Sequence, residues 1–168
     1  MAVREILLLG NPKLYEVCES VKQEELENIH DIVSDLHDTL MYFRSKYSVG
    51  RAIAAPQIGV MKRLIYMCID NSTTVFINPG LCDQSQEKIE VWDDCMCFPD
   101  LLVKVKRHRA CRIRFRNLQW GETEIYVEGD LSELLQHEYD HLDGILAVSR
   151  AINGQSFALR SQRDLLYS

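Results

Sequence analysis

Apolar residues between positions 24 and 46 recur at intervals of three and four. The series consists of Leu26, Ile29, Val33, Leu36, Leu40 and Phe43. This spacing predicts an amphipathic α-helix, because a helix completes one turn in about 3.6 residues. We therefore expect a long helix in the N-terminal half of the chain, with His30 and His37 as ordinary histidines on its surface or edge. Before it, the apolar residues 5–9 end in a turn at residues 10–12 and are expected to lie along the body as an arm.

Past Gly50 the pattern changes to short runs that are typical of β-strands. Five such runs cover residues 63–69, 73–78, 101–105, 111–116 and 122–127. Turn residues at Asn71-Ser72, Asn78-Pro79-Gly80 and Trp120-Gly121 are expected to interrupt them. Their close spacing favours antiparallel pairing over helical crossovers.

A second helix is expected near position 130. Asp130 can serve as its N-cap, Glu133 stands three residues later as in a capping box, and Gly144 can end it. The elements together predict an α+β fold, with mostly antiparallel strands packed around this central helix. At 168 residues, with 46% hydrophobic and 26% charged side chains, the chain suits one domain over residues 1–168.

The overall charge of −6 provides no general attraction to nucleic acids or anionic membranes. No apolar run reaches the roughly 18 residues of a membrane span, and the first ten residues lack the layout of a signal peptide. We expect a cytoplasmic location with the six cysteines reduced. The basic residues between 104 and 116 alternate along a strand, which favours a solvated face; a groove for an acidic or carboxylate-ended substrate is the alternative.

The second helix contains the motif His137-Glu138-x-x-His141. Residues four apart lie on one face of a helix, so both imidazoles can bind one cation. Glu138 lies about 100° further around the helix axis. There its carboxylate can take a proton from a metal-bound water. The alternative is a solvated or hydrogen-bonded face without a metal, which a third ligand would exclude.

Two further stretches contain residues that a metal hydrolase needs. Residues 50–59 are small and flanked by glycines, and Gln57 among them can donate to an oxygen that becomes negative in a tetrahedral intermediate. A simple turn between elements is the alternative. Residues 91–100 contain Cys95 and Cys97, and either thiol can complete a Cys-His-His site that leaves a fourth position open for water. The alternative is that both are buried as small hydrophobic residues.

Taken together, these stretches resemble the motifs of the peptide deformylase family. Residues 136–144 match its third motif fully, and residues 10–14 resemble its usual opening. Residues 50–59 resemble Gly-x-Gly-Leu-Ala-Ala-Pro-Gln-x-Gly, with differences at Ala52 and Ile53. Residues 93–97 resemble Glu-Gly-Cys-Leu-Ser only at the cysteine, which selects Cys95 over Cys97 as the ligand.

The resemblance implies a metal-dependent hydrolase that removes the formyl group from formyl-methionyl peptides of newly made proteins. It implies one divalent ion, Fe²⁺ first and Zn²⁺ or Ni²⁺ in purified protein, bound by Cys95, His137 and His141. Glu138 would move protons, while Gln57 and the backbone N–H of Met96 would hold the oxyanion. Candidate substrate-binding residues are Gly50, Ala52, Ile53, Val91, Asp94 and Leu134. The expected partner is an N-formylated peptide or nascent-chain N-terminus, and the expected state is a monomer or weak homodimer.

Several residues depart from the family pattern near the expected metal. Asp94 replaces a glycine, and its carboxylate is expected to raise the pKa of metal-bound water and crowd the substrate. Asp130 stands where the family usually has an apolar residue near the methionine pocket, and Glu133 lies on the same helix; both favour an altered substrate. Cys97 replaces a serine and adds an oxidisable thiol. A related metal amidase for another N-acylated substrate, or a metal-binding protein with little deformylase activity, are the alternatives.

Overall fold

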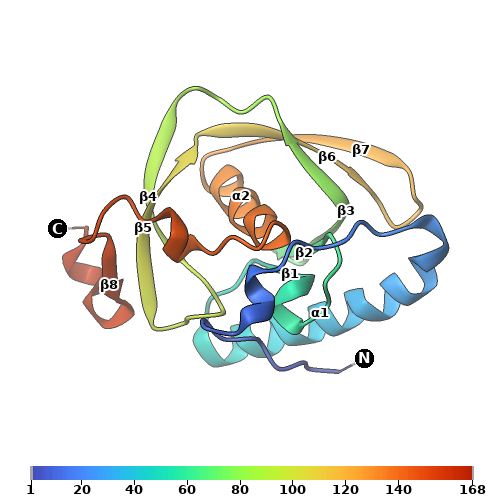
Figure 1. The fold of residues 1–168 in the computed structure, drawn as a ribbon, viewed down its shortest axis with the longest axis horizontal. Coiled ribbons are helices and arrows are strands. Elements are labelled where there is room, and N and C mark those ends of the chain that lie inside the picture. The colour runs from blue at the N-terminus through green and yellow to red at the C-terminus, as the bar shows by residue number, and fades with distance from the viewer. Residues whose placement is uncertain (1, 168) are drawn as a thin grey trace.

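The structure, a computed structural model, describes residues 2–167, which form two α-helices and eight strands (Figure 1). The helices are α1 (Leu26–Tyr47) and α2 (Asp130–Leu142). The strands are β1 (Ala52–Ala54), β2 (Leu64–Ile69), β3 (Ser72–Cys82), β4 (Lys88–Asp94), β5 (Leu101–His108), β6 (Ala110–Arg116), β7 (Glu122–Glu128) and β8 (Phe157–Leu159). The predicted α+β class is confirmed, and the ladders between these strands are antiparallel.

The strands form two sheets around α2. One sheet has the order β1-β2-β3-β6-β7 and the other the order β4-β5-β8. Figure 1 shows α2 in the middle of the molecule with strands on several sides, while α1 runs along the bottom. Nine of the 13 residues of α2 are buried. The helix is therefore enclosed, as a central helix in this fold class requires, and its polar residues need partners inside the protein.

Apolar side chains gather in clusters that hold these elements together. The expected apolar face of α1 is buried: Ile29, Leu36, Leu40 and Phe43 pack with residues of β1 and β2. A second cluster joins α2 to the larger sheet through Leu135, Leu142, Ile65, Phe76 and Ile113. A third cluster contains Cys95 and Cys97 with Leu14, Val103 and Val105. Both cysteines are thus buried among apolar groups, whatever chemistry they perform.

The N-terminal arm lies along the body, as expected, and it reaches both stretches with candidate chemistry. The N–H of Leu7 donates to the carbonyl of Gln57 at 2.8 Å, and the N–H of Leu9 donates to the carbonyl of Cys97 at 2.9 Å. His30 is exposed, and His37 forms a hydrogen bond with the Tyr66 hydroxyl at 2.7 Å. Across residues 2–167, no helix combines the length and the apolar character needed to cross a bilayer.

The break predicted at Asn78-Pro79-Gly80 is wrong. β3 continues through these residues to Cys82, with a shift of its register against β6 between Ile77 and Gly80. A bulge suits this position because proline has no N–H to give to a ladder. Asn78 adopts a φ of 50°, and its side chain both donates to and accepts from the backbone of Val21, each at 2.8 Å. These bonds tie the segment before α1 to the sheet.

The predicted N-cap of α2 is also wrong. Gly129, with a φ of 59°, is the N-cap, and Asp130 is the first helical residue. The N–H of Glu133 donates to the carbonyl of Gly129 at 3.0 Å, so the backbone rather than a capping box closes the first turn. Gly144 follows the end of the helix with a φ of 69°, as expected, and a side chain there would collide with the backbone of Tyr15.

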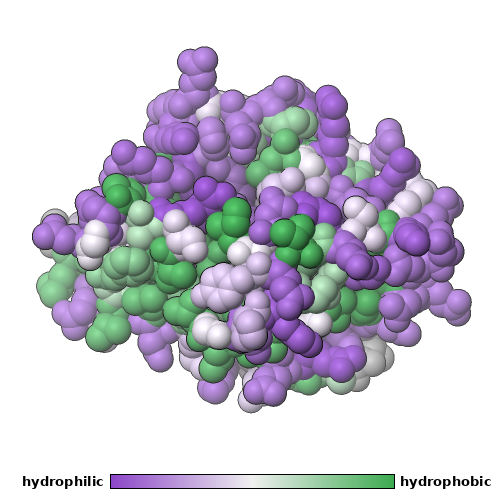
Figure 2. Space-filling view, in the orientation of Figure 1, coloured by the Kyte–Doolittle hydropathy of each residue, from purple (hydrophilic) through white to green (hydrophobic). Residues whose placement is uncertain are grey.

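The surface differs from one part of this view to another. Figure 2 shows mostly hydrophilic residues over the upper part, where β3, β4, β6 and β7 lie, and a hydrophobic area around the C-terminal segment at the lower left. Phe157, Leu159 and Leu165 of that segment are exposed by 43%, 59% and 69%. Strand β8, which was not predicted, attaches the segment to β5. The C-terminal segment thus comes to lie beside β4 and β5.

Candidate metal centre

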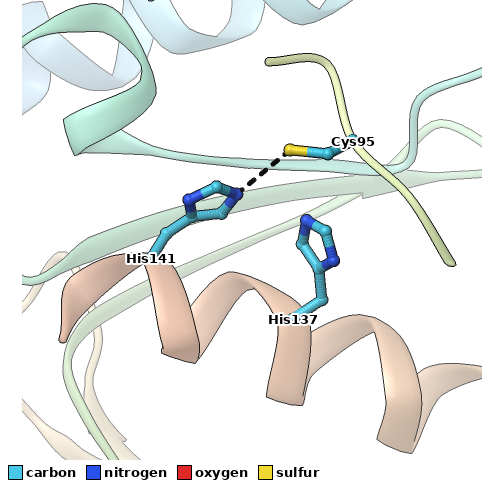
Figure 3. A group of neighbouring side chains, drawn as sticks. All are labelled: Cys95, His137 and His141. Carbon is cyan, nitrogen blue, oxygen red and sulfur yellow. Dashed lines mark hydrogen bonds between the residues drawn. The ribbon is translucent and has the colours of Figure 1, made fainter. Parts of the chain in front are cut away.

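Three side chains from two segments meet beside α2 (Figure 3). His137 and His141 project from one face of the helix, and Cys95 approaches them from the segment that follows β4. One ligand atom of each residue lies within 4.8 Å of the others, and all three residues are buried. Cys95 Sγ lies 3.3 Å from His141 Nε2. This group has the composition and spacing of a Cys-His-His metal site.

Cys97 does not join this group, although its thiol is close. The backbone N–H of Cys97 donates to Cys95 Sγ at 3.4 Å. Gln57 Nε2 lies 3.7 Å from Cys95 Sγ and 3.6 Å from Cys97 Sγ. The other end of the Gln57 amide is fixed, because Oε1 accepts the N–H of Ala54 at 2.8 Å. That bond directs the NH₂ group of Gln57 toward the centre.

An unpartnered carboxylate oxygen indicates that the centre is built to receive another group. Glu138 Oε2 is buried, and no described residue forms a hydrogen bond with it. A buried carboxylate oxygen without a hydrogen-bond donor destabilises the folded protein. Native proteins therefore rarely contain such an oxygen unless a ligand, an ion or a water molecule interacts with it. A thiolate with two imidazoles suits Fe²⁺ or Zn²⁺. The residues present therefore fit a single metal ion.

The carboxyl of Glu138 has an altered acidity. Burial raises its pKa from 4.5 to about 7, with the neighbouring His137 acting in the opposite direction. A carboxyl group that titrates near neutral pH can both accept and donate a proton during a reaction. The group next to the candidate ligands is thus suited to general acid–base chemistry.

A buried network holds His137 in place. Asp93 accepts a hydrogen bond from His137 Nδ1 at 2.9 Å, which leaves Nε2 to face the other ligands. Arg107 lies between Asp93, at 2.9 Å, and Asp140, and Arg150 binds the other side of Asp140 at 2.7 Å. Burial would raise the pKa of Asp93, but His137 and Arg107 outweigh it and lower that pKa to about 2. Asp93 therefore stays charged and orients the imidazole.

The prediction of a solvated basic face is wrong for Arg107, which is only 3% exposed. Side chains alternate across a strand, so Arg107 points inward with Val103 and Val105 while Lys104 and Lys106 pair with Glu90 outside. The sequence carries a signal for this: Arg107 occupies an inward position in the apolar alternation of β5. A buried arginine requires anionic partners, and the network supplies them.

A cavity of about 660 Å³ opens beside the centre. Several predicted residues line it, and these are Gly50, Ala52, Gln57, Val91, Asp94, Cys95, Met96, Leu134, His137 and Glu138. Ile53 does not line the cavity and is fully buried in the cluster under α1. The reason is again the alternation along β1, which turns Ile53 away from its neighbour Ala52. His141 lies behind the wall, 1% exposed.

Charged residues that were not predicted as site residues also line the cavity. They are Arg51, Glu90, Asp93, Glu133, Arg160 and Arg163. Arg160, from the C-terminal segment, binds the carboxylate of Asp94 at 2.7 Å and the carbonyl of Pro99 at 2.6 Å. This ion pair offsets the charge expected beside the metal. Sequence reasoning missed Arg160 because it stands 66 positions from Asp94 and belongs to no motif.

An enclosed thiol–imidazole set beside a proton-carrying carboxylate, in an α+β fold, defines a metal-dependent hydrolase. Residues 3–156 match the family model of polypeptide deformylase, and the chain belongs to that family. Peptide deformylase 1 of Prochlorococcus marinus (strain MIT 9313) is 34% identical over 175 residues, which cover 98% of this chain and 88% of that protein.

Solved structures agree with this assignment. The structure of peptide deformylase from Thermotoga maritima has a TM-score of 0.83 to this chain at 25% identity, and covers 91% of this chain and 100% of its own length. The class I type b peptide deformylase from Acinetobacter baumannii with Met-Ala-Ser bound has a TM-score of 0.82 at 26% identity, over 89% of this chain and 98% of its own.

Proposed function

We propose that this chain, as one domain over residues 1–168, removes the formyl group from formyl-methionyl peptides of newly made proteins. The observation that carries the proposal is the meeting of Cys95, His137 and His141 beside a cavity lined by Glu138, whose second carboxylate oxygen has no partner among the described residues, in a member of the deformylase family. The ion is Fe²⁺ in the working enzyme, with Zn²⁺ or Ni²⁺ in purified samples. The protein acts in the cytoplasm as a monomer or weak homodimer.

Cys95, His137 and His141 would hold the ion, with Asp93 fixing the ring of His137. Such an ion supplies Lewis acidity, polarising a carbonyl and making a water molecule acidic near neutral pH. Glu138 takes the proton of the attacking water and later delivers it to the leaving amine, a role that its pKa of about 7 supports.

Two donors would hold the oxygen of the formyl carbonyl as it becomes negative. One is the NH₂ group of Gln57, directed by the bond that its Oε1 accepts from Ala54. The other is the backbone N–H of Met96, which donates to no other described residue. Donors aimed at a developing oxyanion contribute about 3 kcal/mol each in other hydrolases.

The two sheets offer a place for an extended peptide. β1 is an edge strand of one sheet and β4 an edge strand of the other, and residues of both line the cavity. Free N–H and C=O groups on such edges bind an added strand. The Acinetobacter baumannii enzyme was solved with Met-Ala-Ser, which supports a peptide as the ligand here. The substrate contacts would come from Gly50, Ala52, Val91, Asp94 and Leu134.

The test is an assay of protein prepared anaerobically with Fe²⁺ and given formyl-Met-Ala-Ser, measuring release of formate. Acetyl-Met-Ala-Ser at the same concentration is the control, because it differs by one methyl group on the reacting carbonyl. Rapid release of formate with no release of acetate supports the proposal. Release of acetate at a higher rate than formate would show a different amidase, and no turnover of either peptide by metal-loaded protein would contradict the proposal.

A further inference from the structure

The helix face that carries the two imidazoles continues for one more turn toward the N-terminus of α2. Glu133, His137 and His141 are spaced by four residues, so they lie in one row. Glu133 lines the cavity, and its side chain is only 13% exposed. Four residues of helix span about 6 Å, which places this carboxylate one turn from the metal centre along the same wall.

Glu133 shares an ion pair with Arg51, which precedes β1. Arg51 Nη2 lies 3.0 Å from Glu133 Oε1, and Arg51 Nη1 lies 3.5 Å from Asp130 Oδ2. The two carboxylates carry more negative charge than the Arg51 guanidinium carries positive charge, so the three groups together have a net negative charge. No described residue forms a hydrogen bond with the second oxygen of Glu133. The wall at this turn is therefore polar, slightly negative, and provided with an open acceptor.

The open oxygen of Glu133 lies where the first side chain of a bound formyl peptide can reach it, an inference that rests on the proposed function. When the formyl carbon of a peptide is at Glu138, the first Cα is two bonds away and its side chain starts there. A side chain of four heavy atoms spans roughly 5–6 Å, about the distance of one helical turn. The end of such a side chain can therefore meet the carboxylate of Glu133.

We propose that Arg51 and Glu133 extend the substrate range of this pocket beyond formyl-methionyl peptides, to N-formyl peptides whose first side chain ends in a hydrogen-bond donor, an ammonium or a carboxamide, and favour those peptides in a direct comparison. The thioether end of methionine removes water from the carboxylate and gives no donor in return, which is unfavourable for a partly buried charge. A lysine or glutamine end donates to the open oxygen. A carboxylate end is repelled, because Arg51 is already engaged by two acidic residues.

The proposal is tested with formyl-X-Ala-Ser peptides in which X is methionine, lysine, glutamine or glutamate. With the metal-loaded protein at about pH 8, where Glu133 is ionised, we expect kcat/KM for lysine and glutamine to exceed that for methionine by about three- to tenfold, the range of one ordinary net hydrogen bond. Glutamate should be the poorest of the four. Ratios between peptides are compared within each variant, so a general loss of activity does not affect them.

The double variant Arg51→Leu/Glu133→Leu removes both charges together, so that neither is left buried alone. It should reverse the order, with methionine preferred over glutamine by about tenfold. Asp130→Asn is the matched control: it removes the other carboxylate beside Arg51, but that carboxylate is 90% exposed. Its ratios should stay within about twofold of the parent values, because an exposed carboxylate remains hydrated.

A parent enzyme that prefers methionine over both lysine and glutamine by tenfold or more would overturn the proposal, and so would a double variant with unchanged ratios. If no formyl peptide is hydrolysed, the proposed function fails while the pocket can still be examined. In that case, the affinities of the unformylated peptides Lys-Ala-Ser and Met-Ala-Ser are measured by calorimetry, and their ratio tests the pocket assignment. Tighter binding of Lys-Ala-Ser by the parent, lost in the double variant, supports the pocket assignment, and equal affinities contradict it.

Discussion

Two regions on one face of α2 differ in how their charges are accommodated. Around His137 and His141 the polar groups are buried and organised by a network through Asp93, Arg107 and Asp140. One turn earlier, Glu133 has one paired and one open oxygen, and its partner Arg51 is 39% exposed. In the first region several buried groups fix the geometry together, while the second consists of one partly exposed arginine shared by two carboxylates.

This difference shows which parts of the site can change independently. Substituting any member of the metal centre leaves a buried charge or a donor without its partner, so each residue there depends on the others. The Arg51–Glu133 wall lacks such a network, and other side chains can replace it without disturbing the ligands. Reaction chemistry and substrate choice are therefore separable on this helix, and the following predictions test that separation.

The largest effect is expected from Glu138→Gln. An amide keeps the shape of the residue but cannot accept a proton at neutral pH, so kcat should fall by roughly 10²–10⁴-fold. Metal content should stay near one ion per chain by elemental analysis. His137→Ala is the comparison, since it should lose both metal and activity. A Glu138→Gln enzyme with near-normal kcat, or one that loses its metal as completely as His137→Ala, would contradict the separation of base and ligand.

Arg107→Met should lower the free energy of unfolding by about 3–5 kcal/mol, because it leaves the carboxylates of Asp93 and Asp140 buried with too few partners. Urea denaturation measures the change. Lys106→Met on the same strand is the matched control, because Lys106 is 54% exposed and should cost less than about 1 kcal/mol. Equal losses in both variants would show that the network does not organise the centre.

The pH dependence of stability should reveal Glu133 in protein freed of metal by a chelator, since a bound cation would hold its pKa down. Burial raises the pKa of Glu133 from 4.5 to about 7, so the folded chain favours the neutral form. Its contribution is fully present below about pH 4.5 and is lost as the pH rises through 7. Relative to the parent, Glu133→Gln should gain on the order of 3 kcal/mol between these limits, measured by urea denaturation. Parallel curves for parent and variant would contradict this.

The sequence predicted the parts of the molecule that repeat a local pattern. The period of α1 and the spacing of His137 and His141 are local, and both were visible without a structure. Short strands such as β1 and β8 have too few residues to show a period. The Arg107 network and the Asp94–Arg160 pair depend on tertiary packing between distant residues, which no spacing rule reports.

Asp94 gives the smallest expected effect, and its ion pair with Arg160 changes what we expect from it. From the sequence, its carboxylate should weaken the metal and move the acid limb of kcat/KM to higher pH. In the structure Arg160 binds that carboxylate at 2.7 Å, and the side chain is 44% exposed. A paired, partly hydrated charge is felt only weakly at a distance near one Debye length, about 8–10 Å.

We therefore expect Asp94→Gly to leave the pH profile in place and to change kcat/KM by less than about twofold. Arg160→Met should have the larger effect, because it leaves the carboxylate without its cation. The acid limb should then move up by a few tenths of a pH unit, the size of an exposed charge–charge interaction. The double variant should return to the parent profile, since it removes both charges; the three pH profiles form a cycle that isolates the pair. A limb that moves down in Asp94→Gly alone would instead show that the metal senses this carboxylate despite Arg160, and that the chemistry and the cavity wall are coupled at this residue.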